Sequence, residues 1–190
     1  RDIIAYWRSR GNKGTSIAVE DAVAKYLESQ DAKVIAGKLE HGSRKRHVKI
    51  AERFGSQCVV VGIDSLQDAD GQWRVRSHTG NPDTTRERHL RTLDWIAEVQ
   101  ERGAGEIVLN CMASDGTRDG FDLAQLSAAR ERCRVPLIAS GGAGCARHFV
   151  EVFQHCDVDG ALAASVFHKN LLTIAGLKQE LAQHGIPIRL

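Results

Sequence analysis

The stretch IASGGAG at residues 138–144, followed by ALAAS at residues 161–165, decides the fold of this chain. Each stretch is a short apolar run that ends in small residues, and a helical pattern follows it. A strand that ends in glycines exposes backbone N–H groups, and the positive end of the next helix points to the same place. Two such strand ends side by side predict a phosphate-binding site for a phosphosugar or nucleotide on a parallel α/β scaffold.

Short apolar runs alternate with helical patterns from about residue 30 onward. The runs occupy residues 33–36, 58–63, 106–110, 136–140 and 160–164. The helical patterns occupy residues 44–54, 88–102, 122–132, 148–154 and 174–184. This alternation predicts a parallel sheet. Runs that lack polar alternation, such as residues 59–63, predict strands that are covered on both faces.

One strand-helix unit is longer than the others, and residues 1–30 form a segment without an assignable pattern. After Asp64, residues 68–76 contain an Asp-Gly turn followed by an alternating strand, which predicts an inserted hairpin. Loops at the carboxyl end of barrel strands hold active sites. The hairpin is therefore either a substrate-covering element or a surface decoration.

The composition indicates a globular protein of 190 residues, with 42% hydrophobic and 26% charged residues, and we expect a single domain. The net charge of +2 gives no reason to expect nucleic acid as a partner. No apolar run is long enough for a bilayer, and no signal peptide is visible, so we expect no membrane partner. The histidines show no metal-ligand spacing, so we expect no metal, and no cofactor is implied. An odd number of cysteines without a C-x-x-C pair favours reduced thiols and a cytoplasmic location.

Two carboxylates are candidates for proton transfer. Asp64 is expected to end the most hydrophobic strand, where general acids and bases of barrels lie, although an aspartate there can also cap a loop. Asp115 follows another strand, in the tripeptide Asp115-Gly116-Thr117. In isolation this tripeptide is only a turn, but if it lies opposite Asp64 in a barrel, Asp115 is a candidate acid/base partner. The basic run at residues 43–49 is typical of a solvated helix face, with nucleic-acid binding as the lesser alternative.

From about residue 50 to the C-terminus, the chain resembles the cyclase subunits of imidazole glycerol phosphate synthase, a family of histidine biosynthesis. The stretches that carry the resemblance are residues 54–64, 102–110, 115–117, 138–144 and 161–168. The resemblance implies a (βα)8 TIM barrel of the ribulose-phosphate-binding type. It also implies a lyase that closes an imidazole ring with ammonia from a glutaminase subunit. The implied substrate is the phosphoribulosyl-formimino derivative of aminoimidazole carboxamide ribotide, and the products are imidazole glycerol phosphate and aminoimidazole carboxamide ribotide.

The resemblance assigns roles to residues of this chain by position. Asp64 matches a catalytic aspartate, and Asp115 matches a loop aspartate beside the active site. The positions that match the binding of substrate and one of its phosphates are Gly116, Thr117, Ser140, Gly141, Gly142, Ala143, Ala164 and Ser165, with Asn110 and Thr79 lining the site. Gln57 and Glu106 match polar residues of the barrel interior on the ammonia route.

The amino-terminal part departs from the family pattern. A first strand ending in Cys-Leu-Asp-Val, which carries the family's other catalytic aspartate, does not occur in these residues. Because a barrel of this kind needs about 250 residues, we expect an incomplete barrel of about five to six βα units. Gly14-Thr15, Gly37 and Lys38 stand where the second phosphate site is expected, so that site is absent or altered. Such a chain would pair with itself, pair with a complementary fragment, or be unstable, unless residues outside the given sequence supply the missing strands. A non-enzymatic, phosphate-binding and self-associating fragment is the alternative function.

Overall fold

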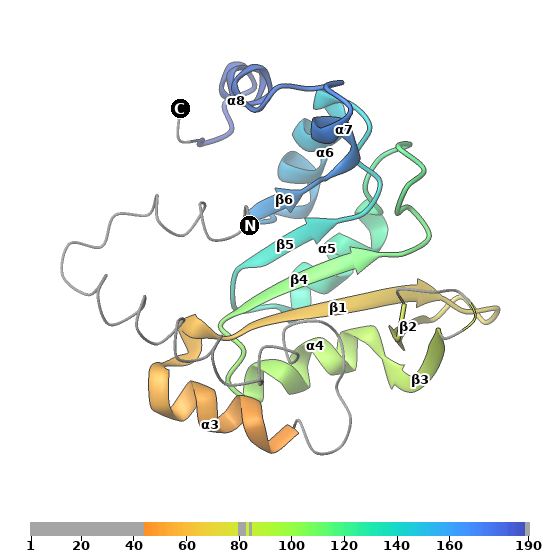
Figure 1. The fold of residues 1–190 in the computed structure, drawn as a ribbon, viewed down its shortest axis with the longest axis vertical. Coiled ribbons are helices and arrows are strands. Elements are labelled where there is room, and N and C mark those ends of the chain that lie inside the picture. Colours follow the sequence, from red (N-terminus) through yellow and green to blue (C-terminus); the bar gives the residue numbers. More distant parts are fainter. Residues whose placement is uncertain (1–43, 80–82, 84, 189–190) are drawn as a thin grey trace. The chain divides into compact units, whose positions relative to one another are not determined.

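The computed structural model describes residues 44–79, 83 and 85–188 (Figure 1). The predictions for residues 1–43, including the strand at 33–36 and the altered phosphate site, lie outside these residues. The helices are α3 (Arg44–Phe54), the 3-10 turn η2 (Ser56–Cys58), α4 (Thr92–Glu101), α5 (Leu123–Arg132), α6 (Ala146–Cys156), α7 (Ser165–His168) and α8 (Ile174–Gln183). The strands are β1 (Val60–Gln67), β2 (Trp73–Ser77), β3 (Arg86–Arg91), β4 (Glu106–Cys111), β5 (Leu137–Ser140) and β6 (Gly160–Leu162).

The strands form one sheet in the order β3-β2-β1-β4-β5-β6 (Figure 1). The pairs β1–β4, β4–β5 and β5–β6 are parallel, whereas β2 and β3 are antiparallel additions at the β1 edge. The predicted α/β class with a parallel sheet is therefore confirmed. The two apolar stretches that end in small residues, β5 and β6, are neighbours as predicted.

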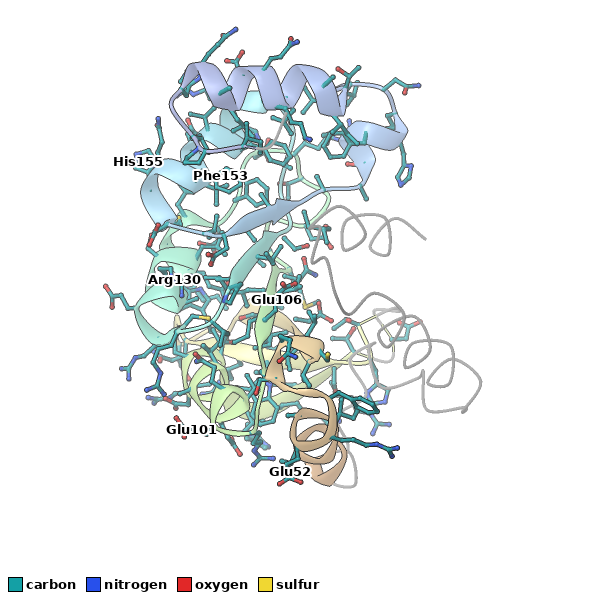
Figure 2. The ribbon with its side chains drawn as sticks, turned by 90° about the vertical axis from the view of Figure 1, so that its left-hand side faces the viewer. Glu52, Glu101, Glu106, Arg130, Phe153 and His155 are labelled. Carbon is teal, nitrogen blue, oxygen red and sulfur yellow. The ribbon has the colours of Figure 1, made fainter. Side chains whose placement is uncertain are left out.

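One face of the sheet is covered by helices. Alternate strand residues such as Ile63, Ile107 and Leu137 point to this face and are buried. They pack with the helix residues of the core cluster, which include fully buried side chains on α4, α5 and α6. Figure 2 shows these three helices on one side of the strands, marked by Glu101, Arg130 and Phe153.

The opposite face is only partly covered in the part of the chain that the structure describes. Gly62 is exposed, and Leu162 is 40% exposed. The prediction that the strands are covered on both faces thus holds for one face among the described residues. In a closed barrel the second face would be the interior, which strands on the far side would cover.

The hairpin is present, but it is longer than predicted. β1 continues to Gln67, so Asp64 lies within this strand and not at its end. Asp64 is nevertheless close to the end of the parallel part, because the pairing of β1 with β4 stops one residue later at Ser65. The prediction of a strand end at Asp64 was wrong because the chain continues straight into the hairpin.

A third strand, β3, was missed. Residues 86–91 pair with β2, and α4 begins only at Thr92, so the predicted helix at 88–102 starts too early. Pairing with an available strand edge overrides a local helical pattern, because strand formation depends strongly on context. Two smaller corrections are that Cys58 belongs to η2 and not to a strand, and that β6 ends at Leu162 before the short helix α7.

Local side-chain hydrogen bonds fix several helix ends. The Asp122 carboxylate accepts a hydrogen bond from the backbone N–H of Gln125 at 2.9 Å and so caps α5. The Thr173 hydroxyl oxygen accepts one from the N–H of Gly176 at 3.1 Å and caps α8. These caps mark the starts of the two helices, which lie within one residue of the predicted starts.

Candidate functional site

A row of polar side chains crosses the sheet near the carboxyl ends of its parallel strands. Asp64 on β1 pairs with Asn110 on β4, and Asn110 pairs with Ser140 on β5. Directly paired strand residues project from the same face. Asp64 and Ser140 therefore lie on the same face, two strands apart, as the phosphate-site hypothesis requires.

The Asp64 carboxylate is held by two neutral donors. The Thr79 hydroxyl donates a hydrogen bond to Oδ2 at 2.5 Å, and the Asn110 amide nitrogen donates one to Oδ1 at 3.0 Å. Both residues were predicted only as residues that line the site. Two donors on separate oxygens fix the plane of the carboxyl group, which suits a group that must meet a substrate proton in one orientation.

The turn after β5 approaches the neighbouring loop so closely that only glycine fits. Gly141 and Gly142 have φ angles of +95° and +106°. A Cβ atom on Gly142 would lie 1.9 Å from the Gly120 carbonyl oxygen, and one on Gly144 would lie 2.0 Å from the Arg118 carbonyl oxygen. The N–H of Gly120 in turn donates to the Gly142 carbonyl oxygen at 2.9 Å. The turn after β5 and the loop after β4 therefore form one packed unit.

The loop after β4 carries Asp115, Gly116 and Thr117 in tight turns. The Thr117 hydroxyl donates to the Ser114 carbonyl oxygen at 2.8 Å, and Asp115 is exposed. Gly116 has a φ angle of +81° with open space around its missing side chain. Among the hydrogen bonds of the described residues, none joins Asp115 to Asp64, so their partnership in proton transfer stays a prediction.

The end of β6 supplies the other half of the predicted phosphate site. Ala164 precedes α7, and Ser165 is the first residue of that helix. Because β5 and β6 are parallel neighbours, their following segments start at the same edge of the sheet. Ala143, in the turn after β5, is buried. The geometry thus places the predicted phosphate-binding positions on adjacent chain segments.

The two residues predicted on the ammonia route lie at the opposite end of the sheet. Glu106 is the first residue of β4 and has the same parity as Asn110, so it belongs to the site face. Figure 2 labels it at the amino end of the sheet. Gln57 lies before β1 in the exposed turn η2, and its amide donates to the Phe54 carbonyl oxygen at 3.2 Å. Gln57 is therefore not on a strand, and its place on the ammonia route stays a prediction.

Two arrangements near the site were missed by the sequence analysis. The Nδ1 atom of His148 accepts a hydrogen bond from the Gly144 N–H at 3.1 Å and so braces the glycine turn from within α6. Behind Asp64, the Ser65 and Thr92 hydroxyls are 2.7 Å apart, and the Gln125 amide also donates to Ser65. All three side chains are buried on the helix-covered face. A serine two residues after the apolar Ile63, on the same side of the strand, is the signal that was available.

The fold and the arrangement of these residues together define a barrel-type α/β protein whose predicted phosphate-binding positions lie at the carboxyl ends of its strands. The chain belongs to the histidine biosynthesis protein family, whose model matches residues 12–173. This is a TIM-barrel family, and the described residues hold part of such a barrel.

Relatives within this family share high identity with the carboxyl-terminal part of the chain. The chain is 65% identical over 140 residues to the imidazole glycerol phosphate synthase subunit HisF of Xylella fastidiosa strain M12. The matched residues make up 74% of this chain and 54% of that relative. The chain is 60% identical over 141 residues to the HisF subunits of Stenotrophomonas maltophilia strain R551-3 and Xanthomonas axonopodis pv. citri, over 74% of this chain and 55% of each relative. The chain thus spans about half the length of these relatives. Within the described residues, no helix has the length and apolar character to cross a membrane.

Proposed function

We propose that the chain carries the cyclase activity of imidazole glycerol phosphate synthase. In this reaction, ammonia condenses with the ketone carbon of the phosphoribulosyl-formimino derivative of aminoimidazole carboxamide ribotide, and the ketone oxygen leaves as water. Ring closure on the formimino carbon then breaks its bond to the other half of the substrate, which gives imidazole glycerol phosphate and aminoimidazole carboxamide ribotide. The observation that carries the proposal is the row of Asp64, Asn110 and Ser140 beside the glycine turn. The 65% identity to a HisF subunit supports it and does not favour the alternative of a non-enzymatic fragment.

In the proposed mechanism, the end of the substrate nearest β5 and β6 is held by its phosphate. Backbone N–H groups of Gly142, Ala143 and Ser165 would donate to the phosphate oxygens, with the Ser140 and Ser165 hydroxyls as further donors. Gly116 and Thr117 would close the loop side of this site. Because the phosphate group is anchored, the reacting carbon and nitrogen atoms are brought to the Asp64 side of the row.

Asp64 is the proposed general acid and base. Its carboxylate would take a proton as ammonia adds to the substrate and return a proton as the chain of the substrate is cleaved. Thr79 and Asn110 keep both oxygens oriented during these transfers. Asp115 is the proposed second carboxylate and comes from the loop beside the proposed phosphate site. Because the reaction cleaves the substrate, the proposed enzyme class is a lyase.

The amino end of the sheet is the proposed entry for ammonia. Glu106 lies there on the site face, so ammonia that passes along this face would reach Asp64. We further propose that a glutaminase subunit supplies the ammonia. Ammonium salt replaces this partner in an assay of the chain alone.

The test is turnover of the substrate with ammonium salt, followed by the loss of substrate and the appearance of both products. The chain should turn over, and Asp64→Asn should reduce kcat by at least about 100-fold, because proton transfer by a positioned side chain contributes about 10²–10⁴-fold. Circular dichroism of both proteins checks that they are folded. Absence of turnover in a folded chain would contradict the proposed activity, and full activity of the variant would remove Asp64 from the proton role.

A further inference from the structure

We propose that Glu87 draws Arg76 away from Asp64 and so leaves the Asp64 carboxylate available for proton transfer. The proposal rests on the proposed function only in the role given to Asp64. Arg76 on β2 pairs directly with Asp64 on β1, and on its other side it pairs with Glu87 on β3. The three residues therefore continue the polar row of the site across the hairpin, with the cation between two carboxylates.

The contacts show which carboxylate holds the cation. The Nη1 atom of Arg76 lies 2.8 Å from Oε2 of Glu87, and the Arg76 side chain is only 8% exposed. Asp64 is instead held by Thr79 and Asn110, which are neutral. Although Nη1 is in ion-pair contact, this buried nitrogen makes no hydrogen bond of normal geometry among the described residues. Arg76 therefore retains a donor that a second carboxylate would satisfy.

Without Glu87, Asp64 is the carboxylate that Arg76 would reach. Cβ atoms of directly paired residues on antiparallel strands are about 5 Å apart, well within the length of an arginine side chain. A buried cation that loses its counter-charge is strongly destabilised, so it moves to another anion if one is in reach. An adjacent arginine favours the ionised form of a carboxyl group. Asp64 paired with Arg76 would thus be a weaker base and a more constrained one.

The hairpin is built so that Glu87 occupies the competing position. Arg74 pairs with Arg91 and Arg76 pairs with Glu87, so two steps along β2 correspond to four steps along β3. This irregularity is a bulge in β3, and bulges next to active sites re-aim side chains. A regular ladder would place His89, and not Glu87, opposite Arg76. The bulge therefore has a direct electrostatic consequence for the site.

The other charged groups around Asp64 are already engaged elsewhere. Arg74 pairs with Asp68 and lies 3.6 Å from Oε1 of Glu87. Arg88 donates to the Ser77 hydroxyl at 2.9 Å, on the helix-covered side of the hairpin, and His78 lies 3.2 Å from the same hydroxyl. On β4 and β5 the neighbours of Asp64 in the row are the neutral Asn110 and Ser140. Among the residues that the structure describes, Arg76 is thus the cation whose partner decides the charge next to Asp64.

The experiment compares Glu87→Gln, Arg76→Gln and the double variant in the full chain, with the ammonium-dependent assay across a pH series. Glu87→Gln should lower kcat by about tenfold, because an Asp64 carboxylate that is paired with Arg76 is a weaker base and is less free to meet the substrate proton. It should also move the acid limb of the rate profile to lower pH. Arg76→Gln should remain within about twofold of the unsubstituted chain. The double variant should have the rate and the pH profile of Arg76→Gln. If the ion pair were merely structural, the double variant would stay as slow as Glu87→Gln.

Crystal structures of the unsubstituted chain and of Glu87→Gln test the same inference without activity. Arg76 should contact Glu87 in the first structure and Asp64 in the second. Glu98→Gln is the control for the loss of an arginine ion pair, because Glu98 on α4 pairs with Arg102, directly after that helix and away from the site. An Arg76 side chain that stays away from Asp64 in Glu87→Gln, or a double variant as slow as Glu87→Gln, overturns the inference. If the unsubstituted chain is inactive, the proposed function fails while the two structures still decide this point.

Discussion

At the scale of single residues, the proposed phosphate site depends on glycines, at positions where any side chain would clash. Gly142 has a φ angle of +106°, and a Cβ atom on it would lie only 1.9 Å from the Gly120 carbonyl oxygen. The left-handed region alone costs a residue other than glycine about 1–2 kcal/mol. The close approach adds to this cost, because the atom that must move belongs to the backbone. The path of the glycine turn therefore depends on the absence of a side chain at position 142.

Gly142→Ala should destabilise the chain by about 2–5 kcal/mol, since overpacking adds about 1–3 kcal/mol to the backbone strain of about 1–2 kcal/mol. Gly185→Ala is the matched control, because Gly185 has a φ angle of +73° but nothing near its missing side chain. That control should lose only about 1–2 kcal/mol. Urea unfolding followed by circular dichroism gives both values. Equal losses in the two variants would show that the contact with Gly120 contributes nothing.

The residues of the site divide into those that sequence can identify and those that it cannot. Asp64 and Ser140 were predicted to meet because the ends of parallel strands share one edge of the sheet. The bond from Thr79 to Asp64 was not predictable from spacing, because it depends on the path of the chain after β2. Arg76 and Glu87 were missed for a similar reason, since the bulge in β3 sets their register.

At the scale of elements, the hairpin is the part that the sequence predicted least completely. The Asp-Gly turn and the alternating β2 were predicted, but β3 was taken for the start of a helix. Its sequence, RERHLR, contains one large apolar residue and no stretch of β-branched residues, so nothing local distinguishes it from a helix surface. The partner strand supplies the missing information, and that information is not local.

The turn between β1 and β2 is organised by Asp68. Its carboxylate accepts hydrogen bonds from the N–H groups of Asp70 and Gln72 at 3.0 and 2.8 Å and is bonded to Arg74. The Arg74 guanidinium, followed by the bond from Gln72, holds the pKa of the Asp68 carboxyl below its usual value of 3.8. A lowered folded-state pKa stabilises the fold above the unfolded value, and this contribution is lost as the pH falls through the folded value.

Asp68→Asn should therefore be less stable than the unsubstituted chain at pH 7, and this difference should shrink as the pH falls below 3.8. The asparagine oxygen still accepts from the two backbone N–H groups, so the variant removes mainly the charge. Urea midpoints measured from pH 7 to pH 3 test this expectation. A difference in stability that is the same at every pH would show that the charge of Asp68 has no effect on folding.

At the scale of the whole molecule, the described sheet has one face that helices cover and a second, more open face that is only partly covered. The packed face could be predicted from the apolar runs and the helical stripes, because both patterns are local. Which of the two faces is open could not be predicted, because β1 and β5 carry apolar residues on both faces of the sheet. The polar row of the proposed site lies on the open face, where a substrate has access to it.

The reactivity of the cysteine thiols tests how stably the helices cover the packed face of the sheet. Cys111 on β4, Cys133 after α5 and Cys156 on α6 are buried, whereas Cys58 and Cys145 are exposed. Burial raises the pKa of the thiols of Cys111, Cys133 and Cys156 above the usual value of 9.0. Since the thiolate is the reactive form, these three thiols are doubly protected, by their pKa and by the helices over them.

An alkylating reagent at pH 7.5 should therefore modify Cys58 and Cys145 rapidly and the three buried thiols only through unfolding. Mass spectrometry of the intact chain should show a plateau at two adducts, and at five adducts after addition of guanidinium chloride. The variant Cys58→Ser/Cys145→Ser is the control, and it should show no fast phase. If Cys156 reacted as fast as Cys145 under native conditions, α6 would open independently of the sheet. The glycine turn that α6 braces through His148 would then lack the rigid support that phosphate binding needs.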